Sequence, residues 1–493
     1  MPAGDEAASA GGSWSSANRA LLERCRERPA LGHRAAFAPL HQENPLPRYP
    51  SLQSWPVFAD AARIRELERI AAGLTRLLKG VPARCFGGDC VRMAAFYGVD
   101  QPELLAAVLA EPNGIEAALA RLDFLEDGSG LRCLELNAGS YVGGWYTERL
   151  APLYLRCSEL AAFLQGQGLR ASHRPTIRLM FAHIVRDTRR RCRRDGELNL
   201  ALVLHPQTDS FLRSLDPPEL LQRELDAALA AEDPALRGSI FLCGYGDLEV
   251  GPAACRYRGR PVHAILEQQD GPTHPAAFRL FKAGSVNLFS GPVTGLLSDK
   301  RNLALLSAAA GEGGPPAGAA APACPLSDDE RRLVSRHLPW TRLAAPAAAV
   351  FRGAPVFVPD LLAGRREELV LKSAQSVGGA DVHVGRFLAA GAWDEAVRHA
   401  LAAPGWIVQE EVRALPWLLP AADEGLAAYD VVWGVFVFGE SYGGTFVRML
   451  PRERHGVVNV RQGCEVGIVL EVGAAGRDGA APAGDAGDGT AAG

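Results

Sequence analysis

Four segments in the last third of the chain carry polar side chains where an element is expected to begin or end. In chain order these are Asp299 and Lys300 before a predicted helix, Lys372 at the end of strand 369–372, Gln409, Glu410 and Glu411 at the end of a strand that starts at Trp406, and Arg448 at the end of strand 443–448. The Lys372 strand runs into the loop SAQSVGGADV, which holds two adjacent glycines. An ammonium group beside the backbone amides of a glycine loop suits anionic phosphate oxygens.

Each segment taken alone favours a simpler interpretation. A lysine at a strand end is usually a solvated charge, and a Gly-Gly pair is usually a turn. The order and spacing of the segments favour a site. Residues 409–411 follow Lys372 by 37 positions, and their backbone groups and carboxylates could read an adenine amino group and a ribose hydroxyl beside an apolar slot.

A second polar cluster lies in the first third, in the stretch RLDFLEDGSGLRCLELN over residues 121–137. Two apolar/polar alternating runs around the Gly-bearing segment 126–130 predict a β-hairpin. With alternating side chains, Leu122, Phe124, Leu134 and Leu136 would face a core, and Arg121, Asp123, Cys133, Glu135 and Asn137 would share the other face. The alternative is a solvated face with a cross-strand pair of Arg121 and Glu135.

Periodicity predicts the elements that would position these residues. Helical patterns run through residues 57–120, as in ADAARIRELERIAAGLTRLLKG and PELLAAVLAEPNGIEAALARL. Helical stretches alternate with short apolar runs over 145–290, which indicates βαβ units and a parallel sheet, and residues 291–470 indicate a mixed, antiparallel α+β region. Residues 1–16 and 471–493 are expected to be disordered tails and 308–325 a mobile loop, because they hold hardly any large apolar side chains.

Composition places the protein in a broad class. The chain has 493 residues, 48% hydrophobic content and a formal charge of −4, which is typical of a globular protein with no electrostatic reason to bind nucleic acid or a membrane. The basic run 186–194 is interpreted as a solvated helix face. The absence of a signal-like or membrane-spanning segment predicts a cytoplasmic location. Ten cysteines without a C-x-x-C pair predict reduced, mostly buried thiols.

The order of these segments resembles the ATP-grasp enzymes, in particular the circularly permuted branch that includes glutathionylspermidine synthetase. The hairpin stretch is similar to that branch's R-x-D-F…D-G…L-E-x-N segment, and GPVTGLLSDKRNLALL, LPWTR, LVLKSAQSVGG and WIVQEEV resemble later segments in order. The resemblance covers roughly residues 57–468. It implies an α/β (α+β) fold: a helical segment with a metal-binding hairpin over 17–144, a Rossmann-like pre-ATP-grasp domain over 145–290, and a nucleotide-binding region over 291–470.

The resemblance also implies roles for individual residues. Asp123, Glu135 and Asn137 would hold Mg²⁺ that bridges the ATP phosphates, and Arg121 would stabilise the transferred phosphoryl group. The remaining implied contacts are Lys300 and Lys372 on the phosphates, the loop residues Ser376, Gly378 and Gly379 over them, Gln409, Glu410 and Glu411 on adenine and ribose, and, more loosely, Arg448 and Asn459 on phosphate or substrate. Ser373 stands where the family commonly has proline, and AGSYVGGW replaces its Thr/Pro-rich segment.

The activity implied is that of an ATP-dependent carboxylate–amine ligase that forms an acyl phosphate intermediate. A phosphotransferase on the same fold and a degenerate nucleotide-binding scaffold are the alternatives. The expected partners are small-molecule or peptide-like carboxylate and amine substrates. Histidines such as His205, His274, His383 and His455 are expected to be structural or surface residues.

Overall fold

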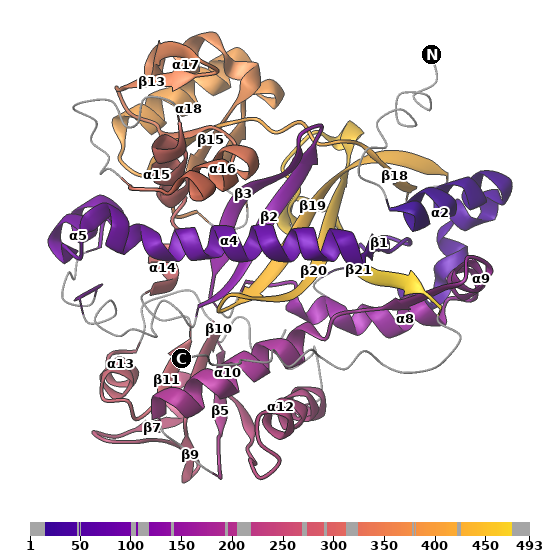
Figure 1. Cartoon of the computed structure of the whole chain (residues 1–493), viewed down its shortest axis with the longest axis vertical. Helices are drawn as coiled ribbons and strands as arrows, with labels where there is room; N and C mark the ends of the chain where they lie inside the picture. Colours follow the sequence, from indigo (N-terminus) through magenta and orange to yellow (C-terminus); the bar gives the residue numbers. More distant parts are fainter. Residues whose placement is uncertain are drawn as a thin grey trace, which may run out of the picture.

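The protein is described by a computed structural model that is arranged around three β-sheets (Figure 1). The structure describes residues 15–46, 49, 51–99, 105–106, 118–139, 142–192, 196–204, 218–268, 274–289, 293–311, 324–376, 379, 381–421 and 425–475. Within these residues no helix combines the length and the apolar character that crossing a membrane requires.

The largest sheet has eight strands and draws on both ends of the chain. Its main path runs through β1 (Val57–Asp60), β21 (Glu465–Ala474), β20 (Ser441–Pro451), β19 (Leu426–Phe438), β2 (Leu119–Asp127) and β3 (Gly130–Ala138), with β18 (Trp417–Pro420) beside β19 and β4 (Leu169–Ser172) beside β21. The long helix α4 (Ala61–Phe86) crosses one face of this sheet (Figure 1). Its apolar stripe from Ile64 to Phe86 is buried there, as its helical periodicity predicted.

The predicted hairpin forms, and it lies against the last third of the chain. β2 pairs antiparallel with β19, so that Asp123 lies opposite Gly434. More than 290 residues separate these strands in sequence. The hairpin and the C-terminal region therefore share one sheet.

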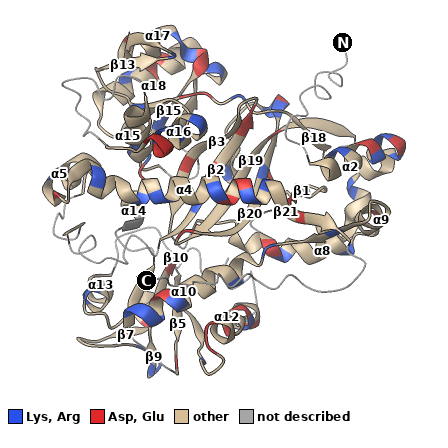
Figure 2. Cartoon of the chain, viewed as in Figure 1, with Lys and Arg blue, Asp and Glu red and all other residues tan. Residues whose placement is uncertain are grey.

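The second sheet is parallel, as the apolar runs of the middle region predicted. Its strand order is β11 (Asn287–Phe289), β10 (Ala264–Gln268), β5 (Leu200–Leu204) and β6 (Ile240–Cys243). Around it lie α10 (Thr176–Cys192), α12 (Pro218–Glu232), α13 (Pro275–Lys282) and a small sheet of β7 (Leu248–Val250), β8 (Cys255–Tyr257) and β9 (Arg260–Val262). The basic end of α10, blue in Figure 2, faces α12, where Arg189 pairs with Glu232 and Asp233.

The third sheet is antiparallel and has the order β12 (Thr341–Leu343), β17 (Trp406–Glu410), β15 (Leu369–Ser373) and β16 (Val382–Val384). One of its faces packs on α17 (Val358–Gly364) and α18 (Ala390–Ala402) through Leu369, Leu371, Trp393 and Val408. α15 (Arg301–Ala310) and α16 (Asp328–His337) connect this unit to α4. A separate hairpin of β13 (Ala348–Phe351) and β14 (Ala354–Phe357) extends from it.

The other helices are short and lie mostly near the N-terminal edge of the large sheet. They are α2 (Ser16–Glu27), α3 (Ala38–Gln42), α5 (Cys90–Tyr97), α8 (Ala151–Arg156), α9 (Ser158–Gly166) and α14 (Val293–Ser298), with 3-10 turns at Pro29–Gly32, Arg34–Phe37, Trp145–Leu150, Tyr245–Asp247, Arg366–Glu368, Gly385–Phe387, Arg452–Arg454 and Val460–Gln462.

Several expected boundaries were wrong. The helical pattern over 102–122 ends in strand β2 from Leu119, because these residues join the ladder with β19; most of the pattern lies outside the described residues. The expected C-terminal tail begins too early, since β21 continues to Ala474 by pairing with β4. The expected loop 308–325 overlaps α15, which ends at Ala310, and residues 312–323 lie outside the described residues.

Candidate functional site

The polar face of the hairpin is built around a β-bulge. Arg121 lies opposite Asn137 and Asp123 opposite Glu135, but Phe124 lies opposite Cys133, so Leu134 is an extra residue in β3. A bulge of this kind brings consecutive side chains to one side of the sheet. The expected placement of Cys133 and Leu134 was therefore wrong: Cys133 is buried in the core, and Leu134 lines a cavity beside Glu135.

Asp123 is the centre of a buried cluster with two arginines. Arg121 donates from Nε to Asp123 Oδ1 at 2.8 Å, and Arg448 lies 2.7 Å from Oδ2. Asn137 Nδ2 donates to the same Oδ2 at 3.1 Å. Burial would raise the pKa of Asp123, but the two guanidinium groups outweigh it and hold the pKa well below its usual range. We call Arg121, Asp123 and Arg448 the guanidinium cluster.

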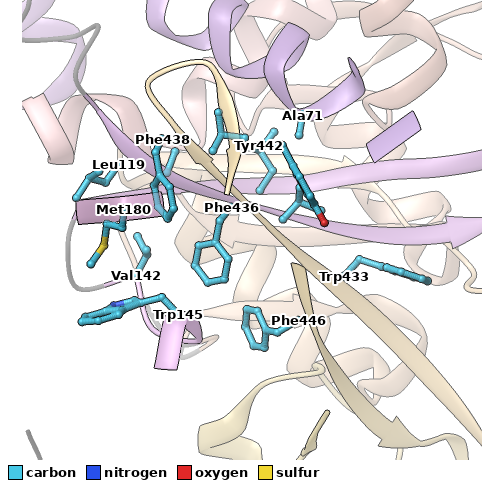
Figure 3. Packing of buried hydrophobic residues seen from close by; sticks show 14 of the residues in the cluster. Ala71, Leu119, Val142, Trp145, Met180, Trp433, Phe436, Phe438, Tyr442 and Phe446 are labelled. Atoms are coloured by element: carbon cyan, nitrogen blue, oxygen red, sulfur yellow. The ribbon is translucent and has the colours of Figure 1, made fainter. Parts of the chain in front are cut away.

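The two guanidinium groups of this cluster lie against the ring of Phe446. The guanidinium carbons of Arg121 and Arg448 lie 5.6 and 5.7 Å from the centre of the Phe446 ring. Figure 3 shows Phe446 beside Phe436, with which it stacks at 5.7 Å. A Cβ atom at Gly434 would lie 2.3 Å from the Phe446 ring, and one at Gly144 would lie 2.4 Å away. Glycine at these two positions therefore makes the room in which this ring sits.

A second charged cluster lies beside the first and consists of Lys300, Lys372 and Glu135. Lys372 Nζ donates to Gln409 Oε1 at 2.6 Å and to the Leu134 carbonyl at 3.4 Å. Lys300 Nζ donates to the Ser376 carbonyl at 2.8 Å and lies 3.5 Å from a Glu135 oxygen. Burial lowers the pKa of Lys372 to about 8, while Glu135 acts in the opposite direction. We call this set the lysine cluster.

Local structure fixes both lysines. Lys372 is on β15, whose neighbour β17 brings Ile407 opposite it and Gln409 two residues further on the same face. Lys300 precedes α15, and its backbone N–H donates to the Ala374 carbonyl at 3.0 Å. The helix start and the strand end are thereby joined, although more than 70 residues separate them.

Both clusters border one cavity of about 950 Å³, part of which is open to solvent. Asp123, Glu135, Lys300, Lys372, Ser376, Gly379, Gln409, Glu410, Glu411, Arg448 and Asn459 all line it. Much of the remaining wall is apolar, with Leu125, Leu134, Val370, Val382, Val384, Phe387, Val412, Val432, Val457 and Val458. A cavity with apolar walls and convergent cations is suited to a flat ring that carries an anionic group.

The composition of the chain makes the two lysines notable. Only four of its 52 basic residues are lysine, namely Lys79, Lys282, Lys300 and Lys372. Lys282 is exposed, and Lys79 lies 3.9 Å from a Glu440 oxygen. The cavity thus holds half of the lysines of an arginine-rich chain. Since a compact ammonium differs from a planar guanidinium in its contacts, lysine at these positions indicates a geometric requirement.

The residues expected to form a base-binding hinge are partly engaged with protein groups. Gln409 contacts Lys372, and Glu410, which also lines the cavity, pairs with Arg352 at 2.7 Å. Glu411 contacts Arg386, a cavity residue that the sequence reasoning missed, and its N–H donates to the Glu368 carbonyl at 2.8 Å. Burial raises the pKa of Glu411. Arg386 follows the short strand after the glycine loop, and only its basic charge beside Glu411 in space identifies it.

Two loop segments meet at the cavity rim. Gly379 lies against the segment 457–462, because a Cβ there would approach Val457, Asn459 and Gln462 within 3.7 Å. Ser376 Oγ and Arg448 Nε are buried at the cavity without a hydrogen-bond partner among the described residues. Gly378, also expected in the site, lies outside the described residues.

The donor set fits Mg²⁺ only in part. Among the described residues no three His, Cys, Asp or Glu side chains gather as a metal-binding group. Asp123 already accepts from two arginines and Asn137, whereas the Glu135 side chain is 27% exposed and faces the cavity. Glu135 suits a cation that takes most of its ligands from phosphates and water, whereas Asn137 is not part of the cavity wall and donates from Nδ2 to Asp123 and Glu135. Arg121 lies behind Asp123, where it also donates to the Val142 and Gly143 carbonyls, and is not part of the cavity wall.

Comparisons with known proteins agree with this architecture at the level of the fold. The chain is similar in structure to a glutathione synthetase-like effector, GSS30, from Globodera pallida in its apo form, with a TM-score of 0.52 over 88% of this chain and 95% of that one. The sequence identity is 12%, so this likeness concerns the fold alone. No family model matches the sequence, and no curated protein does.

Proposed function

We propose that the protein is an ATP-dependent carboxylate–amine ligase of the circularly permuted ATP-grasp type. The observation that carries the proposal is the lysine cluster. Two buried ammonium groups, held by neutral oxygens, point to one apolar-walled cavity beside Glu135. The order of the parts also supports it, because the hairpin that carries Glu135 precedes both lysines in the chain and pairs with the C-terminal strands.

Different cavity residues would bind the phosphates, the base and the Mg²⁺ ion. Lys300 and Lys372 would contact phosphate oxygens, and Ser376 Oγ and Arg448 Nε offer further donors. Valines 370, 382 and 432 and Glu135 line the cavity. The valines would cover the base, and Glu135, with Asn137 two residues further along β3, would hold Mg²⁺. Bound Mg²⁺ would neutralise charge on the phosphates.

The chemistry requires no protein nucleophile. A substrate carboxylate oxygen would bond to the γ-phosphorus as the bond to ADP breaks, giving an acyl phosphate. An amine would then attack the acyl carbon, phosphate would leave, and the amine proton would be lost to solvent. The chain's own contribution is positioning and charge neutralisation, which the two lysines and Arg448 would supply.

Hydroxylamine trapping tests the proposal. The full chain is incubated with ATP, Mg²⁺ and hydroxylamine against a panel of amino acids, short peptides and polyamines, and ADP and hydroxamate are measured. A ligase gives ADP and hydroxamate with one carboxylate. ADP with a phosphorylated hydroxyl acceptor and no hydroxamate would indicate a phosphotransferase, and ATP binding without ADP would indicate a scaffold. In the same assay Lys372→Met should lose most ADP formation. Lys282→Met, which removes an exposed lysine, is its matched control.

A further inference from the structure

The carboxamide of Gln409 is placed where it can hold Lys372. Gln409 is on β17, the second strand of the third sheet, directly opposite Thr341 of β12 and Val370 of β15. Its side chain is buried, at 1% exposure of the residue. A buried amide needs partners for both its oxygen and its nitrogen.

A chain of three hydrogen bonds determines which way this amide points. Lys372 Nζ donates to Gln409 Oε1 at 2.6 Å, Gln409 Nε2 donates to Thr341 Oγ1 at 3.0 Å, and Thr341 Oγ1 donates to the Pro339 carbonyl at 2.9 Å. An ammonium has no acceptor, so only the amide oxygen can face Lys372. The hydroxyl proton of Thr341 is used on Pro339, so Thr341 must accept from the amide nitrogen.

We propose that Gln409 is a positioning residue for Lys372 and that Thr341 fixes the orientation of its carboxamide. A neutral oxygen holds the ammonium in place without neutralising its charge, which leaves that charge for an anionic ligand. A carboxylate at the same place would compete with the ligand. The inference rests on the proposed function only in that Lys372 is taken to bind phosphate.

This role differs from the one that the sequence suggested for Gln409. Residues 409–411 were expected to read the adenine and ribose. With its oxygen and one N–H engaged inside the sheet, Gln409 acts at the phosphate end. Base recognition would then fall to the neighbouring wall, which includes Glu411 and Val412.

Chemical labelling of Lys372 tests the inference without ATP. Each protein is treated at pH 7.5 with pyridoxal 5′-phosphate and borohydride, and modification of the four lysines is followed by peptide mass spectrometry, with exposed Lys282 as the internal reference. In Thr341→Val the amide nitrogen loses its acceptor, so the carboxamide oxygen is held less firmly against the ammonium and stabilises its charge less. A fall of about one pH unit in the pKa of Lys372 would make it react roughly threefold faster.

The opposite change is expected for Gln409→Glu. A carboxylate beside the ammonium would raise its pKa, and a rise of about one unit would slow labelling roughly eightfold. The other titratable groups that face Lys372 are Glu135 and Cys133 of β3, Asp123 of β2 and Lys300 before α15, and they are the same in every variant. Thr341→Ser keeps the hydroxyl and should label like wild type.

Thr75→Val is the matched control. Thr75 is a buried threonine of α4 whose hydroxyl has no partner among the described residues, so its loss should leave Lys372 unchanged. Opposite shifts in Thr341→Val and Gln409→Glu support the inference. Wild-type labelling in both would overturn it, and if Thr341→Val does not fold, Gln409→Glu decides alone. Because no ATP is used, a failed hydroxamate assay would leave this result standing.

Discussion

The guanidinium cluster and the lysine cluster lie side by side, and each places two cations near one carboxylate. In the guanidinium cluster both cations touch the carboxylate directly, at 2.8 and 2.7 Å. In the lysine cluster the ammonium groups are held by carbonyl and carboxamide oxygens, and only Lys300 approaches Glu135, at 3.5 Å. In the first arrangement the carboxylate is engaged by both guanidinium groups, and of these only Arg448 borders the cavity. The second leaves charge available, which is the property expected of a binding site.

The largest effect is expected from Asp123→Asn. It leaves two buried guanidinium groups without their carboxylate, and breaking a buried pair in this way costs about 3–5 kcal/mol. Urea unfolding monitored by tryptophan fluorescence measures the loss. An unfolding free energy within about 1 kcal/mol of wild type would show that the guanidinium cluster is not a structural unit.

Lys372→Met should affect chemistry and spare the fold. The methionine keeps most of the aliphatic volume and removes a charge that is unfavourably buried, but it also leaves Gln409 Oε1 without its donor, so the melting temperature should stay close to that of wild type. Turnover of ATP should fall about 10²–10³-fold if the ammonium stabilises transferred charge. Lys372→Arg should recover only part of this rate. Wild-type turnover in Lys372→Met would remove Lys372 from the mechanism.

The pH dependence of nucleotide affinity provides the next comparison. Because the pKa of Lys372 is about 8 in the folded protein, its charge is present below pH 8 and lost above it. The affinity for ATP should therefore fall as the pH rises through about 8, by at most roughly tenfold per pH unit. Calorimetric titration between pH 6.5 and 9.5 measures this. A flat profile in wild type, matching that of Lys372→Met, would contradict the role of this charge.

The smallest effect on stability is expected from Glu135→Gln. Its side chain is partly exposed, and its contact with Lys300 is 3.5 Å, so unfolding should change by less than about 1 kcal/mol. Asn137→Ala is expected to behave similarly. Mg²⁺-dependent turnover should nevertheless be weakened far more than folding in both. A loss of stability like that of Asp123→Asn, with normal Mg²⁺ dependence, would place Glu135 in the structural group.

The sequence was informative where residue type and strand alternation agree with the final packing. The hairpin, α4 and the parallel sheet followed from such patterns, whereas the convergence of Glu135 with the lysines was implied by the family resemblance. The bulge at Leu134 did not, because one unpaired residue leaves no trace in an alternating pattern of Leu, Cys and Glu. The neutral oxygens that accept from the two lysines could not be predicted from the sequence either. Gln409 and the Ser376 carbonyl meet these ammonium groups only through strand pairing and loop placement.

The bulge has a consequence for how the hairpin tolerates change in length. Because Leu134 has no opposite residue, its removal would let Cys133 directly precede Glu135 in an uninterrupted ladder. The stem with Arg121, Asp123, Glu135 and Asn137 and the tip beyond it could both keep their faces, because Phe124 would still lie opposite Cys133. The deletion would remove the Leu134 side chain from the cavity wall and its carbonyl from Lys372, and it would leave Phe124 and Cys133 in the core. A single-residue deletion here would therefore alter the cavity and spare the core, a class of variation that substitution scans do not sample.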